Sequence, residues 1–101
     1  MNAAWRNASF RNYADYTIGD AYQAGIVQLA GVALTLPVAF MCSEALPWRC
    51  HRSLIANTLV ARGWAVHHIM SVGKVIEHQL GAWGPEPLVA DGRVTYPEPP
   101  D

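Results

Sequence analysis

The spacing of apolar and polar positions predicts a helix in the first third of the chain. It runs over Asp20–Ala30, because apolar residues recur there at the spacing i, i+4, i+7 on one face. That face consists of Tyr22, Ile26 and Leu29. Asp20 can cap the helix and Gly31 marks its end. Residues 1–17 mix polar residues and aromatics without a period, so we expect an irregular lead-in that packs its aromatic rings.

The middle of the chain predicts a strand, a helix and a second strand. Leu36–Cys42 is short and continuously apolar, which is typical of a strand buried on both faces of a parallel sheet. After a loop over Ser43–Cys50, a helix is expected over His51–Arg62, closed by Gly63. Trp64–Met70 follows as a strand. This order is that of a right-handed βαβ crossover.

The last third of the chain gives a weaker pattern. We expect a short helix over Lys74–Leu80, a loop over Gly81–Pro87 and a hairpin over Leu88–Tyr96 that turns at Asp91-Gly92. The predicted fold is therefore one α/β domain over residues 1–101. It has a small, mostly parallel sheet with flanking helices and a C-terminal hairpin.

Composition narrows the class of protein. The chain has 101 residues, of which 51% are hydrophobic and 15% charged, too apolar for intrinsic disorder. Its formal net charge of −1 supplies no field for non-specific nucleic-acid binding. The longest apolar stretch, Leu29–Cys42, is shorter than a bilayer requires. No secretion signal is evident at the N-terminus, so we expect a cytoplasmic protein without a membrane partner.

The candidate chemistry lies between the predicted central strand and the next helix. Arg49, His51 and Arg52 place positive charge where the helix dipole is also positive, which favours a pocket for phosphate or carboxylate. The predicted ligand-binding residues are Arg49, His51, Arg52 and Ser53. A thiol at Cys50 would have a lowered pKa in this field and is the candidate nucleophile. Glu44 would orient an arginine or act as an acid or base.

Other interpretations of the same segment stay open. Cys42 and Cys50 can be buried packing residues, and Glu44 can form an ordinary ion pair with an arginine. A phosphatase-like Cys-x5-Arg loop starting at Cys42 misses its arginine by one position. A zinc site would use the two cysteines, His51, and His67 or His68. Since the usual closely spaced ligand pairs are absent, we expect no metal and no cofactor.

The remaining histidines have simple expected roles. His67 and His68 are adjacent in a strand and therefore point to opposite faces. One should be buried and hydrogen-bonded and the other should lie nearer to solvent. His78 is expected to be exposed on a short helix.

Residues 41–69 resemble the family of the domain of unknown function 488. The resemblance rests on a strand ending in Cys-x-Glu, followed by Cys-His-Arg opening a helix: Cys42, Glu44, Cys50, His51 and Arg52. Residues 8–16 also look like a family segment, so the resemblance covers most of residues 5–81. The Thr-Ile-Gly-His-Ser-like and Asp-x-Arg motifs with which the family usually begins are absent as a unit. The chain therefore resembles the C-terminal part of a larger α/β domain.

The resemblance implies a fold more than an activity, and whether the protein is an enzyme stays open. The leading hypothesis is an anion pocket for a phosphate-bearing small molecule or a nucleic-acid end, with thiol chemistry at Cys50. The alternative is a non-catalytic, truncated family member that acts as an interaction or structural module. Loss of sheet partners for Leu36–Cys42 would leave an apolar edge, so we also expect a homo-oligomer.

Overall fold

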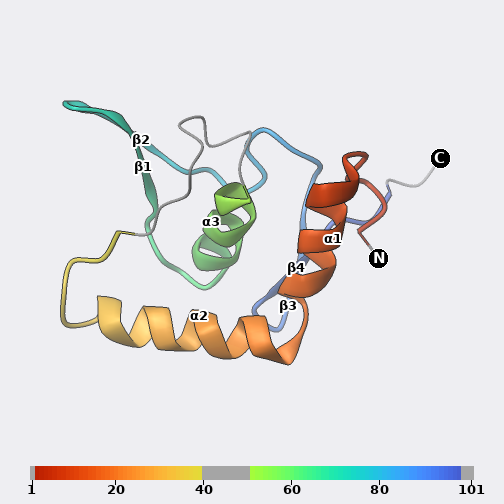
Figure 1. Ribbon diagram of the computed structural model, residues 1–101, viewed down its shortest axis with the longest axis horizontal. Coiled ribbons are helices and arrows are strands. Elements are labelled where there is room, and N and C mark those ends of the chain that lie inside the picture. Colours follow the sequence, from red (N-terminus) through yellow and green to blue (C-terminus); the bar gives the residue numbers. More distant parts are fainter. Residues whose placement is uncertain (1, 40–50, 99–101) are drawn as a thin grey trace.

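Three helices and two β-hairpins make up the described part of the chain, residues 2–39 and 51–98 of a computed structural model (Figure 1). In chain order the elements are α1 (Ala8–Thr17), α2 (Asp20–Ala33), α3 (Arg52–Ala61), β1 (His67–Ser71), β2 (Lys74–Glu77), β3 (Leu88–Ala90) and β4 (Arg93–Thr95). No helix in these ranges is both long enough and apolar enough to cross a bilayer.

The strands are antiparallel, so the prediction of a mostly parallel sheet is wrong. β1 pairs with β2 and β3 pairs with β4, in two separate two-stranded sheets. Gly73, with φ of 78°, lets the chain reverse directly after β1, and a tight reversal gives an antiparallel pair. Val75 and Ile76 then continue as β2, because β-branched residues favour strands. The short helix predicted over Lys74–Leu80 is therefore wrong as well.

The apolar segment Leu36–Cys42 does not behave as a buried strand over its described positions. Residues 36–39 are irregular and exposed, and positions 40–42 lie outside the described residues. Pro37 has no N–H to give to a neighbouring strand. The predicted βαβ crossover therefore lacks its first strand over residues 36–39, and the apolar edge from which an oligomer was expected is not formed there.

The N-terminal segment is helical where an irregular lead-in was predicted. Asn7 caps α1: its side-chain oxygen accepts hydrogen bonds from the backbone N–H groups of Ser9 (2.9 Å) and Phe10 (3.2 Å). The expectation that the aromatic side chains pack is confirmed, because the rings of Trp5 and Phe10 lie 4.9 Å apart. The capping side chain of Asn7 is a sequence signal for this helix, and the spacing of apolar residues does not reveal it.

The other predicted elements are confirmed with small shifts of their ends. α2 continues to Ala33, past the glycine expected to stop it. Its N-cap is Gly19, so Asp20 is not the cap that was predicted and lies in the first turn instead. α3 lies within the predicted range and is followed by Gly63 at φ of 93°. The C-terminal hairpin turns at Asp91 (φ 52°) and Gly92 (φ 73°), which are the positive angles that a type I′ turn requires.

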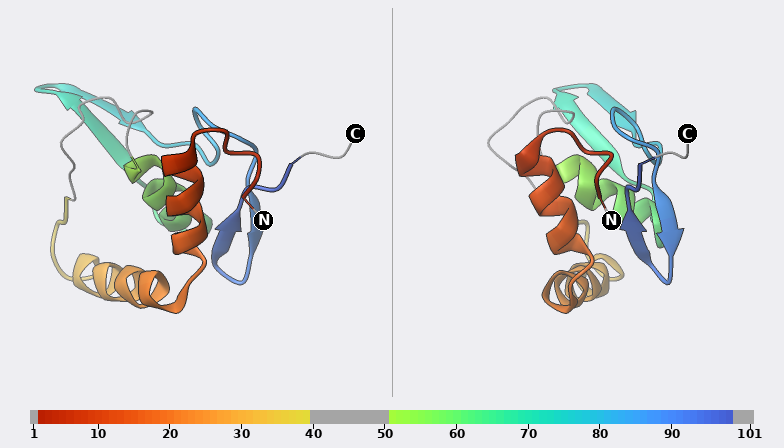
Figure 2. Two further views of the ribbon diagram at one scale, coloured as in Figure 1. Left: turned by 45° about the vertical axis from the view of Figure 1, so that its right-hand side comes forward. Right: turned by 90° about the vertical axis from the view of Figure 1, so that its right-hand side faces the viewer.

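α3 lies at the centre of the molecule, surrounded by α1, α2 and the β3–β4 hairpin, while the β1–β2 hairpin extends away (Figures 1 and 2). One core cluster consists of Phe10, Ala14, Leu54, Val94 and Tyr96. The other consists of Tyr22, Ile26, Ala56, Leu59 and Val66. Because α3 contributes to both clusters, it joins the two halves of the core.

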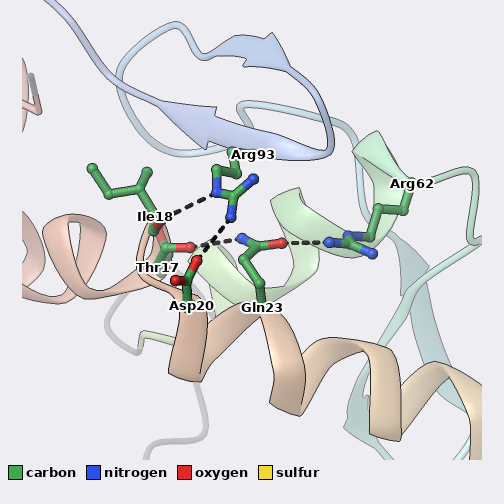
Figure 3. A network of polar contacts seen from close by, with 6 residues as sticks. All are labelled: Thr17, Ile18, Asp20, Gln23, Arg62 and Arg93. Atoms are coloured by element: carbon green, nitrogen blue, oxygen red, sulfur yellow. Dashed lines mark hydrogen bonds and ion pairs between the residues drawn. The ribbon is translucent and has the colours of Figure 1, made fainter.

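A polar network fixes α2 beside α3 and the C-terminal hairpin (Figure 3). The side chain of Gln23 donates to the Thr17 carbonyl (2.8 Å) and accepts a hydrogen bond from Arg62. Arg93 of β4 donates to the Ile18 carbonyl (3.1 Å) and pairs with the exposed carboxylate of Asp20 (3.3 Å). Two arginines therefore stabilise the junction between α1 and α2: Arg62, at the end of α3, and Arg93 of β4.

The Asn7 cap predicts the effect of its removal. Asn7→Ala should lower the free energy of unfolding by about 1 kcal/mol, because two N–H groups in the first turn of α1 lose their acceptor. Urea denaturation followed by circular dichroism would measure it. Asn12→Ala, at an exposed position within α1, is the matched control and should not destabilise the protein. Equal destabilisation by both variants would contradict the capping role.

Candidate functional site

His51 occupies the N-cap position of α3, but its side chain is turned toward α1. Its Nε2 lies 3.0 Å from the Oγ of Ser9, and its ring stacks on Tyr13 with centroids 4.5 Å apart and planes at 22°. The edge of the ring contacts Phe10 at 5.0 Å. The side chain makes no capping bond to α3. The predicted anion ligand is thus held by aromatic packing between two helices.

Arg52 and Ser53 form the first turn of α3, and that turn contains no acidic residue. Ser53 is buried, and Arg52 is partly buried. The guanidinium of Arg52 lies near enough to His68 to help lower the pKa of that imidazole. A permanent cation therefore lies at the positive end of the helix dipole, beside a histidine.

Of the predicted site residues, the structure describes only these three. The others, Glu44, Arg49 and Cys50, lie outside the described residues. His51 and Arg52 are adjacent in sequence, but their side chains act on different elements. The ring of His51 faces α1, whereas the charge of Arg52 acts on β1.

A pair of buried histidines lies beside this turn, and the sequence analysis found only one of them. His67 and His68 point to opposite faces of β1, as predicted. His67 is exposed and lies 3.7 Å from Glu77, while His68 is 4% exposed. His78 is 3% exposed, so its predicted exposure is wrong. The Nε2 of His68 and the Nδ1 of His78 are 2.8 Å apart.

The side chain of Asn57, from the middle of α3, determines the direction of these hydrogen bonds. Its Oδ1 must be the acceptor, because the backbone N–H of Gly81 donates to it at 2.9 Å. The Nε2 of His78, 2.7 Å from the same oxygen, is then the donor. The Nδ1 of neutral His78 therefore accepts from the Nε2 of His68, and the second nitrogen of neutral His68 is left as a proton acceptor.

The network continues from Asn57 to both ends of the described chain. The Asn57 amide donates to the Tyr96 hydroxyl at 2.9 Å. The Tyr96 backbone N–H donates to the Asn2 side chain at 2.8 Å, and Asn2 donates to Asp15 at 2.8 Å. All of these residues except Asp15 are buried. Each is polar, so the network satisfies groups that would otherwise be costly to bury.

Burial keeps both imidazoles neutral at pH 7. Desolvation lowers the pKa of His78 to about 4, with a smaller contribution from His68. Desolvation also lowers the pKa of His68, and the charge of Arg52 adds to the effect. The Tyr96 hydroxyl has its pKa raised to about 12, chiefly by burial. The site therefore contains neutral proton acceptors and donors beside one fixed cation.

The indole of Trp83 lies against both histidines. Its ring centroid is 5.2 Å from His68 and 5.8 Å from His78, and the residue has φ of 63°. A bulky residue seldom adopts a positive φ, so the loop holds Trp83 at a cost in backbone strain. Trp5 packs so closely on Gly84 that a Cβ there would lie 2.6 Å from the indole. That contact and the bond from Gly81 to Asn57 position the loop.

The described residues contain no group of three or more His, Cys, Asp or Glu side chains placed to hold a metal ion. The cysteines of the zinc hypothesis lie outside these ranges. What the described groups of this site supply is the positive charge of Arg52 and neutral imidazoles that can accept a proton. Asn57 lies beside the apolar stripe of α3 and next to a second polar residue, Thr58, so the sequence of this helix carries only a weak signal for the buried network.

Comparison with known proteins gives one result. The model of the family described as "Domain of unknown function DUF488" matches residues 1–59. The match includes α1, α2 and the first part of α3, and it ends before β1 and the histidine pair. No curated protein and no solved structure matches the chain.

The buried imidazoles predict a pH-dependent stability. The unfolded chain binds a proton at His78 near pH 6.5, whereas the folded chain does so near pH 4. The contribution of neutral His78 to the free energy of unfolding is therefore fully present above pH 6.5. About 3 kcal/mol of it is lost as the pH falls to 4. Urea denaturation at several pH values would measure it.

The variant His78→Gln should lose most of this slope, because an amide can keep a donor toward Asn57 and an acceptor toward His68 without titrating in this range. His67→Gln, at the neighbouring exposed histidine, should keep the slope. If the slope survives in His78→Gln, the assignment to the buried pair is wrong.

Proposed function

We propose that this chain, which belongs to the DUF488 family, binds a phosphate-bearing ligand at the start of α3. The observation that supports the proposal most directly is the placement of Arg52. Its charge lies in the first turn of α3 and acts on the neutral imidazole of His68. An anion there would interact with a guanidinium and with the positive end of a helix dipole.

The neutral imidazole gives the proposed site a group that can take up a proton. His68 stays unprotonated at pH 7, and its hydrogen bond to His78 fixes which nitrogen carries the hydrogen. An anion that binds with a proton, such as monohydrogen phosphate, or a hydroxyl that must lose one, would find an acceptor beside the cation.

Further residues enter the proposal from the sequence alone. Arg49 would add a second guanidinium, Cys50 would be the nucleophile of a thiol-dependent reaction, and Glu44 would orient an arginine or move a proton. His51 and Ser53 contribute in this proposal through the helix turn they belong to, because the ring of His51 contacts α1 and Ser53 is buried.

The proposed ligand is a phosphate-bearing small molecule or a nucleic-acid end. A net charge of −1 argues against binding along a nucleic-acid backbone, since that requires an extended positive surface. We place this function in the cytoplasm and take the chain to correspond to the C-terminal part of the family domain, as the sequence indicates.

A second candidate function is that of an interaction module, here a homo-oligomer. It is favoured by the apolar side chains exposed on the β1–β2 hairpin and along and beyond the end of α2. They are Val27, Val32, Leu34, Leu36, Val38, Ile69, Val72 and Val75. Ile69 and Val75 are cross-strand neighbours, so they form one apolar face on a hairpin that extends away from the core (Figure 1).

Removing the guanidinium tests the anion site. Arg52→Ala should weaken the binding of inorganic phosphate by at least about tenfold, because one charge-assisted hydrogen bond contributes about 1.5–3 kcal/mol. Isothermal titration calorimetry of the full chain would measure it. Arg6→Ala, at an exposed arginine outside the site, is the matched control and should bind as the parent does. Equal losses in both variants, or no binding by the parent, would refute the proposal.

Light scattering tests the alternative. At micromolar concentration the parent chain should be a dimer or larger, and the double variant Ile69→Lys/Val75→Lys should be a monomer, since charge on an exposed strand face opposes pairing. Val89→Lys, at an exposed position on the other hairpin, is the control and should leave the mass unchanged. A monomeric parent would rule out self-association through this surface.

A further inference from the structure

Ser9 and His51 each lie at the start of a helix, yet neither side chain caps its helix and the two side chains contact each other. The first turn of α1 is capped by Asn7, which leaves the Oγ of Ser9 without a capping role. The side chain of His51, at the N-cap of α3, makes no capping bond. Instead, the Oγ of Ser9 and the Nε2 of His51 lie 3.0 Å apart, across 42 positions of sequence.

The imidazole is oriented by rings on both sides of this contact. Tyr13 stacks on it at 4.5 Å and Phe10 meets its edge at 5.0 Å, so its nitrogen is fixed toward Ser9. With its hydrogen on Nδ1, His51 accepts the hydroxyl hydrogen of Ser9 at Nε2. Ser9 itself is exposed, so a small molecule can reach its hydroxyl.

From this geometry we propose that Ser9 and His51 form a nucleophile–base pair that takes an acyl group from a small, activated carboxylic ester. A serine hydroxyl becomes a useful nucleophile when a base within hydrogen-bond reach removes its proton. The pair uses neither Arg52 nor His68, and it shares with the proposed anion site only His51, whose side chain contacts α1.

The reaction is a simple exchange at the ester carbonyl. The Oγ of Ser9 forms a bond to the carbonyl carbon, the bond to the leaving alkoxide or phenolate breaks, and the hydroxyl proton passes to Nε2 of His51 and then to the leaving group. Water, deprotonated by the same nitrogen, then hydrolyses the acyl-serine. It releases the carboxylic acid and returns both side chains to their starting state.

The experiment is incubation of the full chain with p-nitrophenyl acetate, followed by nitrophenolate absorbance and mass spectrometry of the digested protein. We expect one acetyl group on Ser9. Ser9→Ala should lose the acetylated peptide, and both Ser9→Ala and His51→Phe should slow nitrophenolate release by about a hundredfold. Phenylalanine keeps the stacking on Tyr13 while removing the base, and circular dichroism would verify that both variants fold.

Ser71→Ala, at an exposed serine of β1, is the control and should release nitrophenolate at the parent rate. Three results would each overturn the proposal. The first is acetylation at residues other than Ser9 only. The second is an unchanged rate of nitrophenolate release in Ser9→Ala, which would mean that an imidazole reacts alone. The third is an unchanged rate in His51→Phe. Loss of phosphate binding in Arg52→Ala leaves this outcome unaffected, so the two proposals fail separately.

Discussion

The amide of Asn57 is the constraint on which the rest of the molecule depends. It lies in the middle of a helix whose residues are buried on several sides, and a buried amide left without partners costs about 1–3 kcal/mol. Its oxygen receives hydrogen bonds from His78 and Gly81, and its nitrogen donates to Tyr96. Two segments from the second half of the chain, residues 78–81 and the segment that contains Tyr96, therefore have to meet α3 at fixed positions.

The chemistry of the site follows from that arrangement. Because Asn57 accepts from His78, the second nitrogen of His78 is available to His68, and both rings are buried as neutral groups. Arg52, one helical turn and a half before Asn57, adds a charge that the buried network itself lacks. The same helix thus supplies the fixed cation at its start and the polar anchor of the histidines at its centre.

Sequence reasoning predicted what local signals determine. The helices at Asp20–Ala33 and Arg52–Ala61 follow from periodicity, and the Asp91-Gly92 turn follows from the positive φ angles that only certain residues adopt readily. It failed where a short apolar run is compatible with two structures, a buried strand and an exposed irregular segment. Leu36–Cys42 suits a buried strand by composition, but burial depends on what the rest of the chain places against it.

The candidate site also has one part that the sequence predicted and another that it did not. That Arg52 lies at the start of a helix was predictable, because the sequence indicated a helix over His51–Arg62 that Gly63 closes. The partnership of Asn57 with His78 and Tyr96 was not, since no local pattern joins residues 21 and 39 positions apart. His78 was misassigned for that reason: a histidine in a polar stretch gives no sign that the tertiary structure encloses it.

One contact has a consequence for how the molecule assembles. Asn2 and Tyr96 are 94 positions apart and bond through the backbone of Tyr96, while Ala4 donates to the carbonyl of the same residue. The hairpins and helices can close early over short loops, but this contact closes nearly the whole chain and carries the largest loop entropy. During synthesis on the ribosome, α1 therefore leaves the exit tunnel well before its partner strand has been made. The buried network is then complete only after the last strand has emerged.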